Sequence, residues 1–582
     1  MNSSKDGLRA NLKSILKTVG LLDTARQIRR KAPFLTEPEP NGHESVYHQR
    51  FLEFKRQYGD VLRHTLNDAS QEQRKALIIG SGFPEVELEL GLIKALELAG
   101  FIPVVIIIHE RENQEYYNLA SVKELYFWED VYTSPDFTTA ETIIERFQSV
   151  EELKTFEYAD ARVGKIAVST ALRKLRVGTL DLQAAPDRQT LIACLASSMA
   201  SATASQRLLR QVRPELALFV DWVYTPEAEL FDTCLMQDIS TITWDPAHKS
   251  NTLLLTRYTL EYRDQNHGSL SPESWQLVRN MEWTDTHREQ LQQELYSAYA
   301  SGDWYSVCGT QFNKRLMDAE DLRKRLGLDP AKKTAFIFPH IFWDASLTWG
   351  EDIFRDYEEW FIEAVRAACA NNQVNWVIKI HPAHVGKSVM ESFHDEPAEV
   401  VALREHIGNL PPHISFIPAD SDINTFSLFE LMDYCLTVRG TVGIEAASFG
   451  IPVLTAGTGR YDHRGFTIDS ETRKQYLERL AHIQDIPRLS PAQRELAERY
   501  AYGLFLLRPF PLTTVTLEFH NTKSFLSQIA IRIKTKEEWY TAPDLRSFAQ
   551  WVTEGKLDYL QPLPENYEVP QPYAASIVSV DV

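Results

Sequence analysis

Basic side chains, long apolar runs and cysteines are all scarce in this sequence of 582 residues. Lysine and arginine number 61 against 80 aspartates and glutamates, so the formal charge is −19 and the chain has no general field for attracting duplex nucleic acid. The longest strongly apolar stretch, residues 101–108, has eight residues and contains Pro103, whereas a membrane span needs about twenty. We therefore expect neither nucleic acid as a partner nor a transmembrane helix.

The few cysteines indicate the compartment. Five are present, no two of them closer than 40 positions, and their spacing fits neither a disulfide framework nor a zinc site. The amino-terminal segment also lacks the uninterrupted apolar core and the cleavage site of a secretory signal. We expect a cytoplasmic protein with reduced, mostly buried thiols. The five are Cys194, Cys234, Cys308, Cys369 and Cys435.

Several familiar motifs are missing as well. The turn at residues 80–82 has two glycines but lacks the third glycine of a dinucleotide fingerprint, and Glu85, Glu87 and Glu89 would repel a pyrophosphate there. The chain contains no phosphate loop and no nucleophile elbow, and its second half has neither a paired acidic motif nor zinc-ligand spacing. A Rossmann dehydrogenase is disfavoured, and neither a metal nor another cofactor is expected.

The amino-terminal segment differs in charge from the rest of the chain. Residues 1–31 hold eight basic and two acidic side chains, and their apolar residues recur at intervals of four and three, which indicates an amphipathic helix. Two interpretations stay open: the helix docks on the body of the protein, or it lies peripherally on the anionic inner face of a membrane. The apolar positions are Leu8, Leu12, Ile15, Val19 and Leu22.

Alternating strand and helix patterns dominate the first half of the chain. Residues 75–110 predict a strand, a glycine turn, an amphipathic helix and a second strand, which together form a βαβ unit. Residues 215–248 repeat this order, with strands that end at Asp221 and Asp245. A parallel sheet covered by helices is expected. Residues 251–330 are richer in helix formers, and their tryptophans are expected to pack in a core.

The second half shows the same alternation and carries the candidate binding residues. One apolar strand ends in Lys379, His381 and Pro382, at the carboxyl end of a parallel strand, where open α/β sheets bind ligands. Residues 439–443 form a strand-to-helix turn whose backbone N–H groups and helix dipole favour phosphate. Glu445 follows at a spacing from which it could reach the hydroxyls of a ribose.

The fold class that follows is α/β, with two Rossmann-like domains facing a cleft in a GT-B-like layout. A hydrophobic fraction of 44% fits large buried cores, and the length exceeds one usual domain. The predicted parts are a basic amphipathic helical segment and linker at 1–45, an acceptor domain at 46–250, a helical connection at 251–330, a nucleotide-sugar-binding domain at 331–485, helices packing back at 486–545, and an extended tail at 546–582.

Two blocks of the second half resemble the capsule polysaccharide biosynthesis family, which includes the bacterial capsule Kdo transferases. They are KIHPAHVG at 379–386 and TVRGTVGIEAASFGIPVLTAGTGRYDHRGFT at 437–467, and the similarity is most specific over residues 330–470. In that family a His-Pro pair and a small-residue turn, followed by a glycine and a glutamate, line the nucleotide-sugar site. The matching positions here are His381, Pro382, Thr441, Gly443, Glu445, Pro452, Val453, Tyr461 and Gly465.

The chain also departs from the family pattern. Arg439 and Gly440 stand where serine or asparagine is more usual, and Phe466 replaces a leucine. An added guanidinium would suit an extra negative charge on the donor, so the identity of the donor stays open.

The resemblance implies a metal-independent glycosyltransferase that uses a nucleotide-sugar donor and a surface polysaccharide or lipid-linked glycan as acceptor. The charge of the leaving nucleotide must be met by fixed donors or cations. An inverting enzyme also needs a base from the first half, for which Asp221 is the first candidate and Glu85 the second. The predicted nucleotide-sugar-binding residues are Lys379, His381, Pro382, Arg439, Gly440, Thr441, Val442, Gly443 and Glu445.

Other interpretations of the same layout stay open. A polyol-phosphate transferase with a CDP-linked donor would also use the extra cation, and a UDP-sugar epimerase would need no membrane-facing segment. A non-catalytic assembly subunit would keep the fold without a titratable group facing the nucleotide. Each residue also has a structural alternative, because His381 could be a core histidine and residues 441–445 could merely cap a helix.

Overall fold

The computed structural model describes residues 46–66, 74–82, 85–390, 394–519 and 527–562. The chain divides into two compact units, residues 1–57 and 58–582. Of the first unit only residues 46–57 are described, and they begin helix α3 (Val46–Leu62). The predictions for residues 1–45, including the basic helix, lie outside the described residues. None of the described helices combines the length and the apolar character needed to cross a membrane.

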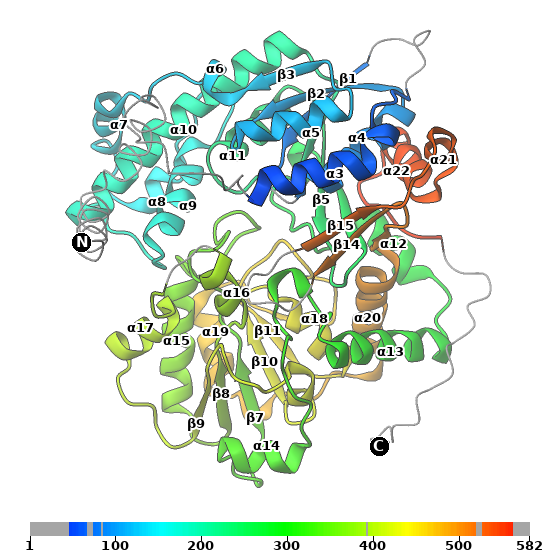
Figure 1. The fold of residues 1–582 in the computed structure, drawn as a ribbon. Coiled ribbons are helices and arrows are strands. Elements are labelled where there is room, and N and C mark those ends of the chain that lie inside the picture. The colour runs from blue at the N-terminus through cyan, green and yellow to red at the C-terminus, as the bar shows by residue number, and fades with distance from the viewer. Residues whose placement is uncertain (1–45, 67–73, 83–84, 391–393, 520–526, 563–582) are drawn as a thin grey trace, which may run out of the picture. The chain divides into compact units, whose positions relative to one another are not determined.

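The first sheet of the larger unit has seven strands in the order β13-β6-β5-β4-β1-β2-β3 (Figure 1). Strands β3, β2, β1, β4 and β5 are neighbours in this order and run parallel. Strand β6 runs antiparallel to β5, and β13, at the edge, runs antiparallel to β6. The strands are β1 (Arg74–Gly80), β2 (Phe101–Ile107), β3 (Glu124–Phe127), β4 (Leu216–Phe219), β5 (Ser240–Pro246), β6 (Thr252–Tyr258) and β13 (Phe510–Pro511).

The second sheet has six parallel strands in the order β12-β11-β10-β7-β8-β9 (Figure 1). Numbered from its own first strand, this is the order 3-2-1-4-5-6 of a doubly wound nucleotide-binding fold. The strands are β7 (Thr334–Ile337), β8 (Asn375–Lys379), β9 (Ile414–Ile417), β10 (Tyr434–Thr437), β11 (Val453–Thr455) and β12 (Ile468–Asp469).

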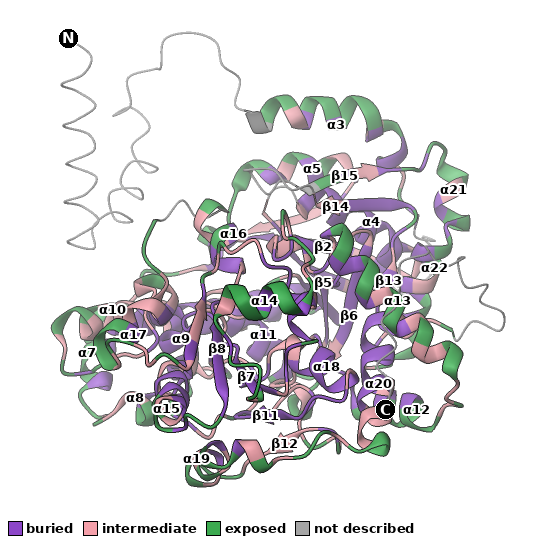
Figure 2. Ribbon diagram, turned by 90° about the horizontal axis from the view of Figure 1, so that it is seen from below, coloured by how far each residue is buried: buried purple, intermediate pink, exposed green. Residues whose placement is uncertain are grey.

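The strands form because short apolar runs are buried on both faces, as parallel sheets require. In β7 the alternation divides the side chains between two cores: Ala335 and Ile337 join one hydrophobic cluster, and Phe336 joins the other. Helices α15 (Tyr357–Ala370), α17 (Ala398–His406) and α19 (Arg473–Ala481) contribute to the first cluster. Helices α13, α18 and α20, with bounds given below, contribute to the second, and Figure 2 shows α18 in the buried colour.

The covering helices follow the sequence pattern closely. Helix α15 starts where the Asp356 carboxylate accepts a hydrogen bond from the Glu359 N–H at 2.7 Å, and Trp360, Phe361 and Val365 then recur on its buried side. The helices of the first sheet are α4 (Glu85–Leu98), α5 (Gln114–Leu119), α6 (Trp128–Val131), α7 (Phe137–Ile144), α8 (Val150–Leu153), α9 (Val163–Leu175), α10 (Ala185–Val212) and α11 (Glu227–Met236). The second sheet adds α16 (Ala383–Met390) and α18 (Thr441–Ser448).

The connecting and carboxyl-terminal parts differ from the expected boundaries. The predicted helical connection at 251–330 opens with β6, an edge strand of the first sheet, before α12 (Pro272–Asn280), α13 (Asp285–Ser301) and α14 (Ala319–Leu326). The predicted tail at 546–582 begins inside a helix, α22 (Pro543–Glu554), whose Trp551 and Phe548 are buried. The intervening elements are α20 (Pro491–Tyr502), a π-helix (Gly503–Leu507), β13, the hairpin β14 (Val515–Phe519) and β15 (Ser527–Ile531), and α21 (Lys536–Thr541).

A buried carboxyl group closes the carboxyl end of β1. The Glu89 side chain is fully buried and accepts hydrogen bonds from the Tyr117 hydroxyl at 2.5 Å and from the Ser81 hydroxyl at 3.0 Å. Burial raises the pKa of Glu89 to about 7. Glu89 therefore does not present its charge to a ligand at the glycine turn; it ties that turn to α4 and α5.

We predict that Glu89→Gln changes the pH dependence of stability. Because the pKa of Glu89 is raised in the folded state, the wild-type protein loses stability as the pH rises from about 5 to about 8, and the neutral glutamine removes that loss. The variant should be close to wild type at pH 5 and more stable at pH 8.5 by roughly 1 to 3 kcal/mol. Urea unfolding at the two pH values measures this. The exposed Glu115→Gln on α5 is the matched control, and equal pH slopes for all three proteins would contradict the prediction.

Candidate functional site

The strand order of the second sheet reverses between β7 and β10, and ligands of open α/β sheets bind beside the carboxyl ends of strands at such a point. His340 follows β7, and its Nε2 accepts a hydrogen bond from the backbone N–H of Arg439, after β10, at 3.2 Å. The imidazole also stacks on Tyr357, with 4.7 Å between ring centroids. Burial and the nearby Arg439 lower the pKa of His340 well below its usual range, so the ring is neutral.

Helix α18 begins at this switch point. Its N-cap is Gly440, in an extended conformation, and the Gly440 N–H is taken by the Thr437 hydroxyl at 3.1 Å. Thr441 and Val442 are half-buried, and among the described residues their backbone N–H groups have no acceptor. Two unpaired donors at the positive end of a helix form a ready anion site, as the sequence predicts for this turn.

Gly443 contributes to this turn by packing. Its own N–H is bonded to the Gly440 carbonyl at 3.0 Å, and a Cβ atom at this position would lie 2.9 Å from Cζ of Tyr461. The Tyr461 hydroxyl donates to the same Gly440 carbonyl at 2.7 Å. The glycine therefore lets a buried tyrosine lie against α18 and fix the carbonyl of the N-cap residue.

Arg439 differs from its expected role. Its side chain is 3% exposed, and the guanidinium donates to the Thr458 carbonyl at 2.9 Å, to the Tyr357 hydroxyl at 2.7 Å and to the Asp352 carboxylate. The sequence predicts a guanidinium that is available to the nucleotide-sugar donor. In the structure its hydrogen bonds go instead to the loops after β7 and β11. The backbone of Arg439, not its side chain, lies at the turn.

Glu445 has a structural partner in the helical connection. Its side chain is 1% exposed and accepts a hydrogen bond from the Tyr299 hydroxyl of α13. Burial raises the pKa of Glu445 to about 7. The carboxyl group therefore joins α18 to α13, and its contact with a ribose stays a prediction.

Lys379, His381 and Pro382 lie one strand away from the switch point, after β8. Lys379 is the last residue of β8 and is 5% exposed, and among the described residues its ammonium group has no ion-pair partner. Burial, with the positive charge of Lys314, lowers its pKa to about 7. His381 is half-buried, its Nδ1 accepts the Ala383 N–H at 3.2 Å, and burial and Lys379 lower its pKa to about 3. Pro382 precedes α16, whose first residues this bond fixes.

Asp344 connects the two sheets at this edge. It lies in the loop after β7 and accepts hydrogen bonds from Arg173 of α9 at 3.3 Å and from the Tyr224 hydroxyl at 3.3 Å, and it pairs with Lys387 of α16 at 2.9 Å. The sequence does not predict a role for Arg173 or Tyr224, because neither residue lies in a recognisable motif. Their role comes from their hydrogen bonds to Asp344 in the loop after β7.

The two predicted catalytic carboxylates occupy different places on the first sheet. Asp221 follows β4 at the strand's carboxyl end, as predicted, and is solvent-exposed. Desolvation raises the pKa of the Asp221 carboxyl group, and the negative charges of Glu227 and Asp344 act in the same direction. Glu85 is the first residue of α4, one turn before the buried Glu89. Asp221 thus shares Asp344 as a charged neighbour with His381.

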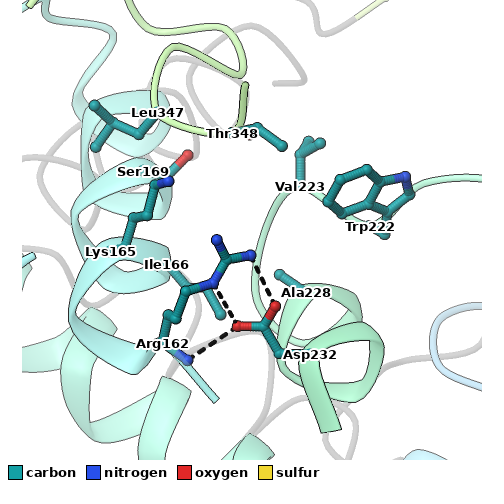
Figure 3. A pocket seen from close by; sticks show the side chains of 10 residues that line it. All are labelled: Arg162, Lys165, Ile166, Ser169, Trp222, Val223, Ala228, Asp232, Leu347 and Thr348. Carbon is teal, nitrogen blue, oxygen red and sulfur yellow. Dashed lines mark hydrogen bonds and ion pairs between the residues drawn. The ribbon is translucent and has the colours of Figure 1, made fainter. Parts of the chain in front are cut away.

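A small cavity of about 30 Å³ lies where these loops meet (Figure 3). Arg162 and Asp232 form a two-pronged ion pair on one side, and the Ser169 hydroxyl of α9 is buried without a hydrogen-bond partner among the described residues. The volume suits a water-sized group and not a sugar, so the sugar site is not this cavity. The lining residues are Arg162, Lys165, Ile166, Ser169, Trp222, Val223, Ala228, Asp232, Leu347 and Thr348.

Two sheets of doubly wound strand order, with an anion-type helix start at the switch point of the second, define a two-Rossmann-domain α/β protein of the GT-B type. Residues 277–495 match the family described as capsule polysaccharide biosynthesis protein. The predicted resemblance to this family is confirmed over that segment. No curated protein matches the chain.

Solved structures give partial superpositions. The β-Kdo 2,4-transferase of Thermosulfurimonas dismutans KpsC is 13% identical, with 50% of this chain and 80% of that chain covered and a TM-score of 0.31. The β-Kdo 2,7-transferase of the same protein is 16% identical, with 56% and 85% covered and a TM-score of 0.32. Anabaena HepE in complex with UDP is 11% identical, with 83% and 99% covered and a TM-score of 0.26. These TM-scores are too low for the ligand of any of these structures to be assigned to this chain.

We predict that Gly443→Ala destabilises the protein, because the added methyl group displaces Tyr461 from α18. The expected cost is about 1 to 3 kcal/mol, typical of overpacking in a core. Thermal unfolding measures it. Adding Tyr461→Phe should recover part of the loss, so that the two changes are not additive. The control is Gly82→Ala, whose Cβ meets no atom within 4 Å; a Gly443 variant as stable as this control would contradict the packing role.

Proposed function

We propose that this protein is a metal-independent, inverting glycosyltransferase. It moves a sugar from a nucleotide-sugar donor to a surface polysaccharide or a lipid-linked glycan. The observation that carries the proposal is the start of α18, where the N–H groups of Thr441 and Val442 lie unpaired at the switch point of a doubly wound sheet. The family match over residues 277–495 includes this turn and the His-Pro pair, and it supports the same activity.

In the proposed reaction the donor's phosphates bind at the start of α18. As the bond between the sugar and the phosphate breaks, negative charge grows on the leaving phosphate, and fixed donors there stabilise it. Lys379 and His381, after the neighbouring strand, add a cation and a hydrogen-bonding ring to this edge. His340 holds the Arg439 N–H and so keeps the turn in shape without adding charge.

The acceptor binds on the side of the first sheet. Asp221, at the carboxyl end of β4, is proposed to take part in removing the acceptor's proton, because it shares Asp344 as a charged neighbour with the nucleotide side. Glu85 is the weaker candidate, since it belongs to the helix start that Glu89 ties down. Contact of residues 1–31 with an anionic membrane would hold the protein near a lipid-linked acceptor.

Nucleotide binding tests the site first. In the absence of metal, one of CMP, CDP, UDP, GDP or dTDP should raise the midpoint of thermal unfolding, and the shift identifies the base. Thr441→Pro should reduce the shift with little effect on the unliganded protein, because proline is tolerated at the first position of a helix but lacks the N–H. Gly440, with ψ of 147°, is already in the conformation that precedes proline.

Thr441→Val is the matched control, since it removes the hydroxyl and keeps the backbone donor. If Thr441→Val abolishes the shift and Thr441→Pro does not, the helix start is not the phosphate site. His381→Ala should also weaken the shift. If no nucleotide stabilises the wild-type protein, the proposal fails in favour of a non-catalytic subunit.

We further predict that nucleotide affinity falls as the pH rises from 7 to 9. The pKa of Lys379 is lowered to about 7 in the unliganded protein, so the side chain loses its proton over this interval. An anion bound nearby favours the charged form, and binding therefore weakens as the proton is lost. Calorimetric titration at several pH values measures this. Lys379→Arg should flatten the dependence, because arginine stays charged; an unchanged slope in that variant would exclude Lys379 as its source.

A further inference from the structure

A second carboxyl group accompanies Asp221 at the edge of the first sheet. Strands β4 and β5 are parallel neighbours, and the last pair in their register is Phe219 with Thr243. Asp221 and Asp245 each stand two residues beyond that pair. The register therefore brings two acidic residues to equivalent places at the carboxyl edge, where the acceptor is proposed to bind.

Asp245 is unusual in its hydrogen bonding. Its Oδ2 atom is buried and has no hydrogen-bond partner among the described residues, and the hydroxyl of Tyr258 in β6 is in the same condition. Asp245 and Tyr258 are electrostatic neighbours, because the Asp245 charge raises the pKa of Tyr258. A buried polar atom without a partner costs free energy and calls for an explanation. A buried carboxyl oxygen without a partner near a ligand-binding edge suits an incoming hydroxyl, which can donate to it.

Aromatic residues connect the neighbourhood of Asp221 with the loop after β7, which belongs to the proposed nucleotide site. Trp222, directly after Asp221, stacks on Phe231 with 3.9 Å between centroids and meets Tyr258 edge-on at 5.0 Å. Trp349, from the loop that follows β7, packs against Trp222 at 5.2 Å. The same loop carries His340 and Asp344. The two acidic residues thus lie beside a wall that is continuous with the loop of the proposed nucleotide site.

We propose that Asp245 is a further catalytic residue, the base that receives the proton of the acceptor hydroxyl, and that the neighbouring charge of Asp221 strengthens this base. This rests on the proposed transferase function. In the step, the acceptor O–H bond breaks and its proton passes to the Asp245 carboxylate. The acceptor oxygen forms a bond to the anomeric carbon, and the bond from that carbon to the nucleotide phosphate breaks, with its electron pair leaving on the phosphate.

The charges around the pair support this assignment. Burial, together with the charge of Asp221, raises the pKa of Asp245 to about 8, and Arg508 and the Thr243 hydroxyl oppose the rise. A carboxyl group so tuned is a stronger base than an ordinary aspartate once it is deprotonated. The charged and titratable groups beside Asp221 are His109, which contacts Glu227 at 2.7 Å, with Glu227, Arg173 and Asp344, and those around Asp245 include Tyr258 and Arg508, which pairs with Asp558.

Nucleotide release from a panel of UDP-, GDP- and CMP-linked sugars, with water as acceptor, tests the proposal. Wild-type turnover should rise with pH as Asp245 loses its proton. Asp245→Asn should lower turnover by about 100-fold, the usual contribution of a general base, while its nucleotide-induced thermal shift stays unchanged. Asp221→Asn removes the neighbouring charge and should move the rising limb to lower pH by about one unit. The exposed Asp130→Asn of α6 is the matched control.

Infrared titration provides a measurement that needs no substrate. Several buried carboxyl groups have raised pKa values, so the measurement is the difference spectrum between the wild type and each variant. Asp245→Asn should remove one protonated-carboxyl band that the wild type keeps above pH 6, and Asp221→Asn should move the titration of that band to lower pH. Circular dichroism checks that both variants are folded.

The inference is overturned if Asp245→Asn keeps wild-type turnover, or if Asp221→Asn leaves both the pH limb and the infrared titration in place. Those results leave nucleotide binding intact and so spare the transferase proposal. Absence of any nucleotide-induced shift in the wild type is the separate result that removes the transferase proposal.

Discussion

Parallel pairing of strands is the constraint on which the rest of this molecule depends. It directs every carboxyl end in a sheet to one edge, so that residues about a hundred positions apart in the chain meet there. His340 after β7 and Arg439 after β10 are joined by a hydrogen bond for this reason, and Asp221 and Asp245 share an edge for the same reason. Where the strand order of a sheet reverses, the loops on either side leave a position at which a ligand can bind. In the second sheet the start of α18, which suits an anion, lies at this position.

Much of the fold is predictable from the sequence, because the apolar runs and glycine turns that define the βαβ units are local. The side-chain directions at the site are not. Arg439 and Glu445 lie in the predicted turn and helix, but their orientation is decided by Tyr357, Asp352 and Tyr299, which come from distant segments. The predicted tail starts too early, because residues 546–554 belong to α22, and Pro543 at the first position of that helix favours its start.

Several buried carboxyl groups share one electrostatic pattern. Glu89, Glu229, Asp245 and Glu445 all have their pKa raised by burial, to values of about 7 to 8. Glu89 and Glu445 accept hydrogen bonds from tyrosine hydroxyls and join helices, so their burial serves the architecture. Asp245 keeps a buried oxygen without a partner at a ligand-binding edge, and this difference separates a proposed functional acid from two structural ones. Glu229 also keeps an unpaired oxygen, but it lies inside α11, with its other oxygen bonded to Thr225 at 2.8 Å.

The buried arginine of the phosphate turn has an evolutionary consequence. The guanidinium of Arg439 is the partner of Asp352 and Tyr357. A lineage that exchanged this arginine for a small residue would leave a carboxylate and a phenol buried without their cation, at a cost in free energy. Arg439, Asp352 and Tyr357 are therefore expected to change together as sequences diverge. An alignment of relatives should show them as one inherited unit, separate from the residues that contact the ligand.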